Sequence, residues 1–351
     1  MDKVAILAIT KNGIKIASSI KQLFPNWEIF APTKFADNTV NAVWYNEQTA
    51  IKIAELFGKF DGIVCLFSLG AVIRLISPYL KDKKTDPAVI VIDDKANFVI
   101  SALSGHLGGA NELTEEIAKK LGATAVITTA ADVNKTIAVD LLGKEFGWKI
   151  EDDSNVTRIS ALMVNEEKIG VYQDAGEKKW WKGELPKNVT IYETLERLLQ
   201  SDSKCFLLIS DREFDDDISK NAVIYRPQTL VAGIGLHVDT TKDKIKESLN
   251  FCLQKYRLSP RSIAKFVSLK KPEEIQGLVE AGMELGIPVE YFERDELSKI
   301  SIPNPSDTVQ AFEGTPSVSE AAALKASAGK LVVEKQKFPP DLTIAIARMT
   351  K

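Results

Sequence analysis

Cysteine and histidine are scarce in this sequence of 351 residues, which contains three cysteines and two histidines. Cys65, Cys205 and Cys252 are odd in number and far apart, so their spacing fits neither a disulfide framework nor a metal-binding motif. Two of the three lie inside apolar runs. This use of cysteine is typical of a protein from a reducing cytoplasm.

Long apolar runs and a strong charge of one sign are also missing. No uninterrupted apolar run approaches the roughly 18 residues that a membrane helix needs. The first apolar stretch, Val4–Thr10, follows an acidic residue and leads into a Lys11-Asn12-Gly13 turn, so we expect no secretion signal. The formal net charge of -3 argues against general nucleic-acid binding, which requires a strongly basic face. We therefore expect a cytoplasmic protein that binds neither membranes nor nucleic acids.

The remaining composition is that of an ordinary globular chain, with 45% hydrophobic and 26% charged residues. The length allows two or three domains with sizeable cores. Residues 1–150 hold 17 basic and 16 acidic side chains, residues 151–226 hold 11 and 16, and residues 227–351 hold 17 and 16. The middle segment is therefore the least suited to an acidic ligand.

These three segments also differ in pattern, and together they predict a multi-domain α/β protein. Residues 1–150 alternate apolar strands with amphipathic helices, which is typical of a mostly parallel sheet flanked by helices. The expected strands are 4–10, 28–31, 63–67, 88–92, 99–103 and 123–127, and the expected helices are 14–24, 46–57, 71–80, 112–121 and 136–146.

The middle segment, residues 151–226, predicts a smaller α/β domain. We expect a hairpin formed by 160–164 and 169–172, and a strand at 204–211. The third segment, residues 227–351, returns to the alternation of strands and helices and predicts a second outer sheet flanked by helices. Its expected strands are 230–234, 264–267, 288–292, 331–334 and 342–347, and its expected helices are 242–256, 272–285 and 317–328.

The turn Ser104–Asn111, with the sequence SGHLGGAN, joins an expected buried strand to an expected amphipathic helix. Its three glycines allow a tight turn and a close approach to a ligand, and the N–H groups of a helix start favour an anion. His106 is suited to proton transfer, because the ordinary pKa of histidine is about 6.5. The alternative is a plain strand-to-helix connection, since the spacing is neither a dinucleotide-binding motif nor a P-loop.

Polar residues follow two further strands of the first segment. Asp93 comes directly after strand 88–92, and Thr128, Thr129 and Asp132 come after the strand that ends at residue 127. Ligands of open α/β sheets bind beyond the carboxyl ends of the strands. We therefore expect these residues at the same edge as the SGHLGGAN turn.

Two features of the middle segment have competing interpretations. Trp180 and Trp181 either form a stacking surface for a flat ligand or pack within the protein, and we favour packing. The run Asp211–Asp217 contains five acidic residues, which suggests calcium. We favour a solvated loop, because the spaced ligand pattern of an EF-hand is missing.

Residues 66–132 resemble the amino-terminal region of the cobalt-precorrin-5A hydrolase (CbiG) family of anaerobic cobalamin biosynthesis. The resemblance rests on motifs in a fixed order, namely a G-x-x-x-R helix with Arg74, a K-D-K-x-T-D-P loop from Lys81, the strand that ends in Asp93, S-G-H-L-G-G-A-N, and I-T-T-A-x-D ending in Asp132. Residues 230–348 resemble the family's carboxy-terminal domain through G-I-G and G-x-P-S-V-x-E-A-A-A-L. One departure is Leu236-His237-Val238 after G-I-G, where the family usually has a cysteine and two arginines.

The resemblance implies hydrolytic opening of the δ-lactone on ring A of a cobalt-containing tetrapyrrole, with loss of a two-carbon fragment as acetaldehyde. It implies no cofactor and no metal site of the protein's own, because cobalt arrives with the substrate. The expected partner is this tetrapyrrole. Neighbouring enzymes of the corrin pathway and a second copy of the chain are further candidates.

Within this reaction, His106 is the candidate general base, a role typically worth ~100- to 10,000-fold in rate. Asp132 or Asp93 is expected to orient its imidazole, as carboxylates do in hydrolytic triads, although both carboxylates equally suit helix capping. The backbone N–H groups of residues 108–110 are expected to stabilise an oxyanion or hold a carboxylate.

The substrate is a flat apolar ring with many carboxylates at its rim, so basic side chains and helix starts are the expected binding groups. The candidate substrate-binding residues are Arg74, Lys81, Lys83, Lys84, Gly105, Gly108, Gly109, Asn111, Thr128, Thr129, Ser317, Ser319 and Glu320. The last three belong to the third segment, which leads to the hypothesis of a cleft between the outer domains.

Two other functions stay open at this stage. A non-catalytic carrier that shields an unstable corrinoid intermediate would use the same basic surface without needing His106 for chemistry. A nucleotide-binding α/β enzyme is less well supported, because neither the dinucleotide-binding motif nor the P-loop is complete.

Overall fold

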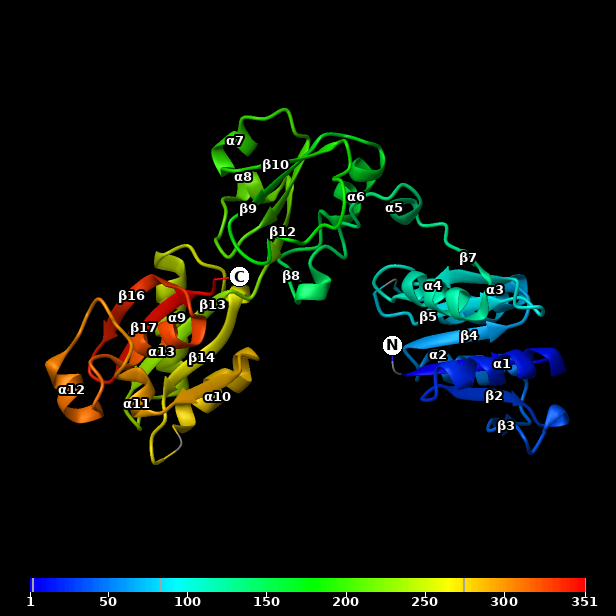
Figure 1. The fold of residues 1–351 in the computed structure, drawn as a ribbon, viewed down its shortest axis with the longest axis horizontal. Coiled ribbons are helices and arrows are strands. Elements are labelled where there is room, and N and C mark those ends of the chain that lie inside the picture. The colour runs from blue at the N-terminus through cyan, green and yellow to red at the C-terminus, as the bar shows by residue number, and fades with distance from the viewer. Residues whose placement is uncertain (2, 83, 274, 351) are drawn as a thin grey trace. The chain divides into compact units, whose positions relative to one another are not determined.

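The computed structural model describes residues 1, 3–82, 84–273 and 275–350. The chain forms two compact units, unit 1 (Met1–Leu141) and unit 2 (Leu142–Lys351), and most of their elements are labelled in Figure 1. Among the described helices, none is long and apolar enough to cross a membrane.

Unit 1 is built on one seven-stranded sheet with the strand order β3-β2-β1-β4-β5-β6-β7. The first five strands in the chain pair in parallel, whereas β6 runs antiparallel to β5, and β7 runs parallel to β6. The strands are β1 (Val4–Ala8), β2 (Glu28–Pro32), β3 (Val43–Tyr45), β4 (Gly62–Leu66), β5 (Ala88–Ile92), β6 (Phe98–Leu103) and β7 (Thr124–Val126). The expected mostly parallel sheet is thus confirmed. The short connection from β5 to β6 explains the reversal, because only antiparallel neighbours can be joined by a tight turn.

Helices cover both faces of this sheet. On one face, α1 (Lys11–Leu23) and α4 (Ala110–Leu121) bury apolar side chains, and on the other face α2 (Thr49–Phe57) and α3 (Leu69–Ile76) do the same. Strands β1, β4 and β5 are buried along their whole length, as expected for central strands between two helical layers.

The expected helix 136–146 is wrong. The structure has a short α5 (Ala130–Val133), irregular backbone after it, and a 3-10 turn at Lys144–Phe146. Thr136, Ile137 and Val139 are β-branched, which disfavours a helix because their side chains lose rotamer freedom against the preceding turn.

The first sheet of unit 2 has the order β10-β9-β11-β12-β8 and is parallel except for β8, which is antiparallel to β12. Its elements are β8 (Lys149–Ile150), α6 (Val156–Val164), β9 (Ile169–Gln173), β10 (Val189–Tyr192), α7 (Leu195–Leu199), β11 (Cys205–Ile209), α8 (Asp216–Ser219) and β12 (Ala222–Arg226). The expected hairpin of 160–164 with 169–172 is wrong, because 160–164 belongs to α6. Val156, Ile159 and Met163 are buried at helical spacing, a period that the sequence analysis overlooked.

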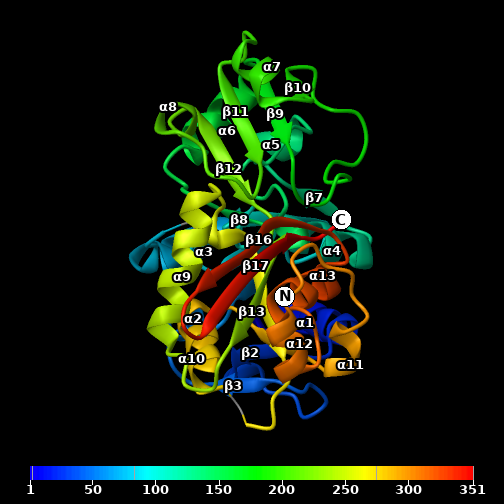
Figure 2. The ribbon, with the colours of Figure 1, turned by 90° about the vertical axis from the view of Figure 1, so that its left-hand side faces the viewer.

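The second sheet of unit 2 has the order β15-β14-β13-β17-β16, in which β13, β14 and β15 are parallel and β17 and β16 antiparallel. Its strands are β13 (Leu230–Leu236), β14 (Ile263–Leu269), β15 (Val289–Phe292), β16 (Lys330–Phe338) and β17 (Leu342–Arg348). Its helices are α9 (Lys242–Lys255), α10 (Gln276–Leu285), α11 (Arg294–Leu297), α12 (Asp307–Glu313) and α13 (Val318–Ser327). Figure 2 shows α9 and α10 on one side of this sheet and α11 to α13 on the other, which agrees with its two apolar cores.

An ion pair that includes a buried carboxylate joins the two sheets of unit 2. Arg348, at the end of β17, donates to both carboxylate oxygens of Asp211 at 2.6 and 2.5 Å, and Thr229 donates to the same carboxylate at 2.8 Å. Asp211 is fully buried. The favoured interpretation of the Asp211–Asp217 run as a solvated loop is therefore wrong for its first residue.

Candidate active site

His106 lies between two carboxylates of unit 1. Its Nε2 atom is 3.0 Å from Oδ2 of Asp132, and its Nδ1 atom is 3.3 Å from Oδ1 of Asp140. The side chains of His106 and Asp140 are 16% and 15% exposed, whereas that of Asp132 is 42% exposed. Asp140 is thus the inner partner of the ring, and Asp132 lies on the side that faces solvent.

The two carboxylates raise the pKa of His106 above its ordinary value. The hydrogen bond with Asp140 is the largest cause, and the negative charges of Asp140 and Asp132 act in the same direction against the opposing effect of burial. Both ring nitrogens carry a proton only in the imidazolium form, which is also the form that can donate to both carboxylates. The site therefore stabilises a positive charge on His106.

The turn that carries His106 depends on close backbone packing. Ser104 and Gly109 both have positive φ angles, +56° and +81°. A Cβ atom on Gly108 would lie 2.4 Å from Cβ of Ser104 and 2.7 Å from its carbonyl oxygen. Glycine at 108 is therefore required so that the chain can fold back over Ser104 and enter α4 at Ala110.

Asn111, in the first turn of α4, connects the parts of the site. Its Oδ1 atom accepts a hydrogen bond from Ser101 on β6 at 2.6 Å, and its Nδ2 atom donates to Thr129 at 2.9 Å and to Asp132 at 2.7 Å. The residue is only 7% exposed. Asn111 therefore fixes the position of the Asp132 carboxylate through a hydrogen bond from a buried side chain.

The backbone N–H groups of the turn are largely used inside the turn itself. The N–H of Gly109 donates to the carbonyl of His106 at 3.0 Å, and the N–H of Ala110 donates to that of Ser104 at 3.1 Å. The N–H of Asn111 donates to Gly105 in the same way, at 3.0 Å. The expected oxyanion site used the backbone N–H groups of residues 108–110. Two of these three groups, those of Gly109 and Ala110, donate to carbonyls of the turn itself and are not available to an oxyanion.

Asp93 lies at the other end of the β5–β6 pair from His106. The antiparallel pairing places Ile92 opposite Val99 and Val89 opposite Leu103, so residues that follow β5 and residues that follow β6 are at opposite edges of the sheet. The Asp93 carboxylate accepts from the backbone N–H groups of Phe98 and Lys95 at 2.6 and 3.1 Å and closes the hairpin. The structure therefore brings Asp132, and not Asp93, to the imidazole.

The expected basic residues are exposed. The 81–86 loop meets the SGHLGGAN turn, because Ser104 donates to the Asp86 carbonyl at 2.9 Å, and the buried Asp86 carboxylate accepts from the N–H of Lys81. Lys81 and Lys84 are exposed on this loop, whereas Lys83 lies outside the described residues. Arg74, on α3, is also exposed and donates to the Gly70 carbonyl of its own helix at 3.2 Å.

Most of the other expected binding residues are less accessible. Thr129 is half-buried and accepts from Asn111, while Thr128 beside it is exposed. In unit 2, Ser317, Ser319 and Glu320 are all at most 1% exposed. Their expected contacts with a substrate stay predictions.

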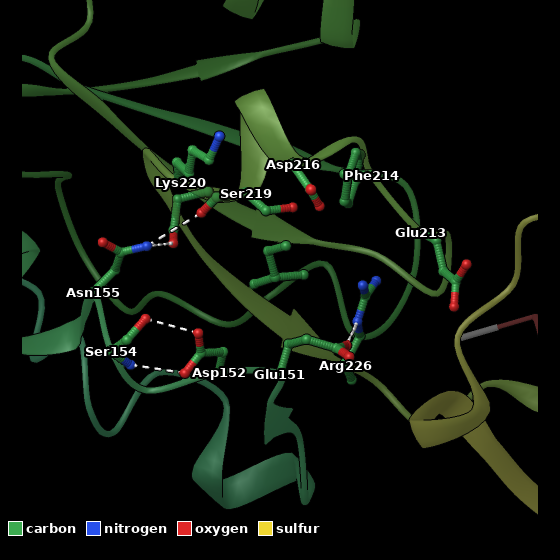
Figure 3. A pocket seen from close by; sticks show the side chains of 12 residues that line it. Glu151, Asp152, Ser154, Asn155, Glu213, Phe214, Asp216, Ser219, Lys220 and Arg226 are labelled. Carbon is green, nitrogen blue, oxygen red and sulfur yellow. Dashed lines mark hydrogen bonds and ion pairs between the residues drawn. The ribbon is translucent and has the colours of Figure 1, made fainter.

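A cavity of about 520 Å³ in unit 2, drawn in Figure 3, has a mixed polar lining rich in acidic groups. Arg226 there pairs with Glu151, and Ser154 donates to Asp152 at 2.7 Å. Its ionisable lining consists of Glu151, Asp152, Glu213, Asp216, Lys220 and Arg226. With more carboxylates than cations, it is poorly suited to an acidic ligand.

Two further observations bear on ligand binding. Trp180 is 6% exposed and donates to Gln173 at 2.8 Å, which fits packing within unit 2 better than a free stacking surface. Across the described ranges, no three His, Cys, Asp or Glu side chains gather in a way that could hold a metal ion.

Asp140 is the site residue that the sequence analysis missed. It is the only charged residue in the stretch Thr136–Leu142, TIAVDLL, which the sequence analysis assigned to a helix. A lone carboxylate in an apolar stretch is a signal, because such a group is seldom buried unless it has a partner.

Comparison with protein families gives three matches that follow one another along the chain. Residues 52–132 match the model described as cobalamin synthesis G N-terminal, residues 137–227 match the cobalamin biosynthesis central region, and residues 230–347 match the cobalamin synthesis G C-terminus. The first match contains His106 and Asp132, and the second begins just before Asp140.

Individual relatives agree with these matches. The chain is 40% identical to a cobalt-precorrin-5A hydrolase from Priestia megaterium, over 98% of this chain and 94% of that protein. It is 29% identical to the cobalt-precorrin-5A hydrolase of Salmonella typhimurium, over 95% of this chain and 94% of that protein. A probable cobalt-precorrin-5A hydrolase from Methanocaldococcus jannaschii is 24% identical, with 98% of both chains covered.

Proposed function

The chain belongs to the cobalt-precorrin-5A hydrolase family, and we propose that it opens the ring A δ-lactone of cobalt-precorrin-5A with water and releases acetaldehyde. The product is cobalt-precorrin-5B, an intermediate of anaerobic cobalamin biosynthesis. The structural observation that supports this proposal is the position of His106 between the carboxylates of Asp140 and Asp132.

His106 is the proton-transfer group of the proposed reaction. Asp140 holds Nδ1 on the inner side, so Nε2 is the atom that is directed toward the more exposed Asp132. When the ring is neutral, Nε2 takes a proton from a water molecule as its oxygen attacks the lactone carbonyl. The imidazolium that results is the form that the two carboxylates stabilise.

The bond changes balance without a co-reactant. Water adds to the acyl carbon, the bond between that carbon and the ring oxygen breaks, and the departing oxygen takes the proton that His106 received. In the second stage the new hydroxyl group gives its proton to the neutral His106, the carbon–carbon bond to the macrocycle breaks, and acetaldehyde leaves. The electron pair of this bond passes to the macrocycle, where a proton completes the product.

Basic side chains of unit 1 supply the binding energy for the acidic rim of the substrate in this proposal. Lys81 and Lys84 are exposed on the loop that meets the catalytic turn, and Arg74 is exposed on α3. Exposed cations next to the site attract a polycarboxylate over a distance of about 8 to 10 Å at moderate salt. Cobalt enters as part of the substrate, and the protein needs no cofactor of its own.

A test of the function uses the full chain with cobalt-precorrin-5A under anaerobic conditions in ¹⁸O-labelled water. The hydrolase proposal expects acetaldehyde above the protein-free rate and one ¹⁸O atom in the newly formed carboxylate. Release of acetaldehyde without the label would exclude attack of water at the lactone carbonyl. Tight binding of the tetrapyrrole without any release above the control would instead identify a carrier.

A further inference from the structure

Three buried hydroxyl groups at the start of α13 have no hydrogen-bond partner within the described part of unit 2. They belong to Thr315, Ser317 and Ser319, which are 0%, 1% and 0% exposed. An unpaired polar group in the interior costs roughly 1–3 kcal/mol, so three such groups within five residues need an explanation. They surround the amino terminus of a ten-residue helix.

The sequence here favours a capping box, but the structure does not form one. Ser317 is the N-cap residue of α13 and Glu320 stands three positions later, which is the S-x-x-E pattern. The Ser317 side chain makes no capping hydrogen bond. The Glu320 carboxylate accepts from the backbone and side-chain nitrogens of Asn304 and from the backbone N–H of Lys335 instead.

The Ser317 hydroxyl therefore does not cap the first N–H groups of α13. The first N–H groups of any helix have no partner inside the helix, and the helix dipole adds a partial positive charge there. In α4 the preceding turn supplies carbonyl acceptors for the N–H groups of Ala110 and Asn111, as described above. At α13 the hydroxyls that normally serve as caps are present and unused.

Close packing places this helix start at the carboxyl end of β13. A Cβ atom on Gly233 would lie 1.9 Å from the carbonyl oxygen of Ser319, and one on Gly235 would lie 3.3 Å from Cβ of Val318. The G-I-G sequence is therefore required for α13 to lie directly on the strand. The carboxyl end of the parallel strands β13, β14 and β15 is the edge at which open α/β sheets bind ligands.

Positive side chains contact residues 313 and 314, just before α13. Lys271, just after β14, donates to the carbonyl of Leu236 at 2.9 Å and to Glu313 at 3.0 Å. Arg294, just after β15, is exposed and packs over Gly314, where its Cδ atom is 2.5 Å from the position of a Cβ atom. The buried carboxylate of Glu320, in the first turn of α13, is already bound by three N–H donors.

We propose that the amino terminus of α13 binds one carboxylate group of the substrate rim through the hydroxyls of Thr315, Ser317 and Ser319 and the first N–H groups of the helix. The identity of the ligand rests on the proposed function, because the tetrapyrrole supplies the carboxylate. Glu320 is not part of this site, since its oxygens are used to anchor Asn304 and Lys335.

The test measures the dissociation constant of cobalt-precorrin-5A for the full chain, by quenching of tryptophan fluorescence, in Ser317→Ala and Ser319→Ala. Each variant should weaken binding about tenfold, as expected for the loss of a hydrogen bond to a charged group. The matched control is Ser262→Ala, which removes another fully buried and unpaired hydroxyl away from α13.

Melting curves without ligand separate binding from folding. Removal of an unpaired buried hydroxyl should leave the melting temperature unchanged or raise it in all three variants. Unchanged tetrapyrrole affinity in both α13 variants would overturn the proposal, and so would an equal loss in the Ser262→Ala control. A parallel titration with inorganic phosphate tests the assignment to a carboxylate, which fails if the α13 variants weaken phosphate binding alone.

Failure of this site is distinguishable from failure of the proposed function. Release of acetaldehyde by the wild type decides the function, whereas the dissociation constants of the variants decide the site. If the wild type binds the tetrapyrrole without turnover, the dissociation constants of the wild type and the variants still test the α13 site.

Discussion

Replacement of Asp140 by asparagine removes a negative charge from the inner side of His106 and keeps the shape of the side chain. Oδ1 of Asp140 and Nδ1 of His106 are 3.3 Å apart. Coulomb's law gives about 1.3 kcal/mol for unit charges at this distance with the dielectric constant of water, and about 5 kcal/mol with the effective value of about 20 near a protein surface. The partly buried pair lies between these limits.

This attraction is available only when His106 is charged, which in the proposed mechanism is during attack of water on the lactone. Its loss should therefore lower kcat by between about tenfold and a few thousandfold, since about 1.4 kcal/mol corresponds to a factor of ten. The pKa of His106 should fall toward its ordinary value in the variant, because its largest raising contribution comes from Asp140. The neutral base then becomes available at a lower pH.

The assay is the pH dependence of acetaldehyde release in single-turnover experiments. The wild type should show a rising limb above about pH 6.5, and Asp140→Asn should move this limb to lower pH with a reduced plateau. Asp94→Asn is the matched control, because Asp94 pairs with Thr10 in the hairpin at the opposite edge of the sheet. An unmoved limb together with less than about a threefold change in the plateau would refute the role of Asp140.

Three further predictions follow from the same contacts. Folding raises the pKa of His106, so the charged imidazole contributes to the free energy of unfolding. This contribution is complete below the unfolded pKa of about 6.5 and is lost as the pH rises through the folded value. The free energies of unfolding of the wild type and His106→Gln, measured with urea, should therefore differ more at about pH 5.5 than at about pH 8.5. Asn111→Ala should lower the free energy of unfolding by about 1–3 kcal/mol, measured with urea, because Ser101 and Thr129 lose their shared partner. Gly108→Ala should reduce kcat strongly with less effect on tetrapyrrole affinity, because the new methyl group would lie 2.4 Å from Ser104 and displace the turn that carries His106; equal kcat would contradict this.

Much of the architecture was predictable because apolar patterning alone specifies it. The fully buried strands β1, β4 and β5 are continuous apolar runs, and α4 and α13 begin and end close to the expected positions. The segment 156–164 shows the limit of this approach. Its apolar residues recur at helical spacing, but the segment is short enough to be mistaken for a strand when few residues are considered.

The candidate site was predictable in part. His106 stood out as a histidine in a glycine-rich turn, and Asp132 stood out at a strand end, and the structure brings the two together. Asp93 stood out by the same rule, but the rule assumes parallel neighbours, and β6 runs antiparallel to β5. Asp140 follows no strand or helix, so only the tertiary fold of an irregular segment brings it to the imidazole.

Satisfaction of backbone groups is a second property that sequence could not reveal. The SGHLGGAN turn and the start of α13 both look like anion sites in sequence. In the SGHLGGAN turn, the carbonyls of Ser104, Gly105 and His106 accept hydrogen bonds from the N–H groups of residues 109–111. These N–H groups are therefore not available to an anion. At α13 the hydroxyls of Ser317 and Ser319 stay unpaired among the described residues.

The most direct measurement of the central claim is acetaldehyde release from cobalt-precorrin-5A by the wild type and by His106→Ala under anaerobic conditions, with the dissociation constant of the substrate measured for both. The account predicts that the variant folds and binds the tetrapyrrole with similar affinity but releases acetaldehyde ~100- to 10,000-fold more slowly. Equal release by the two proteins would contradict it and remove His106 from the chemistry.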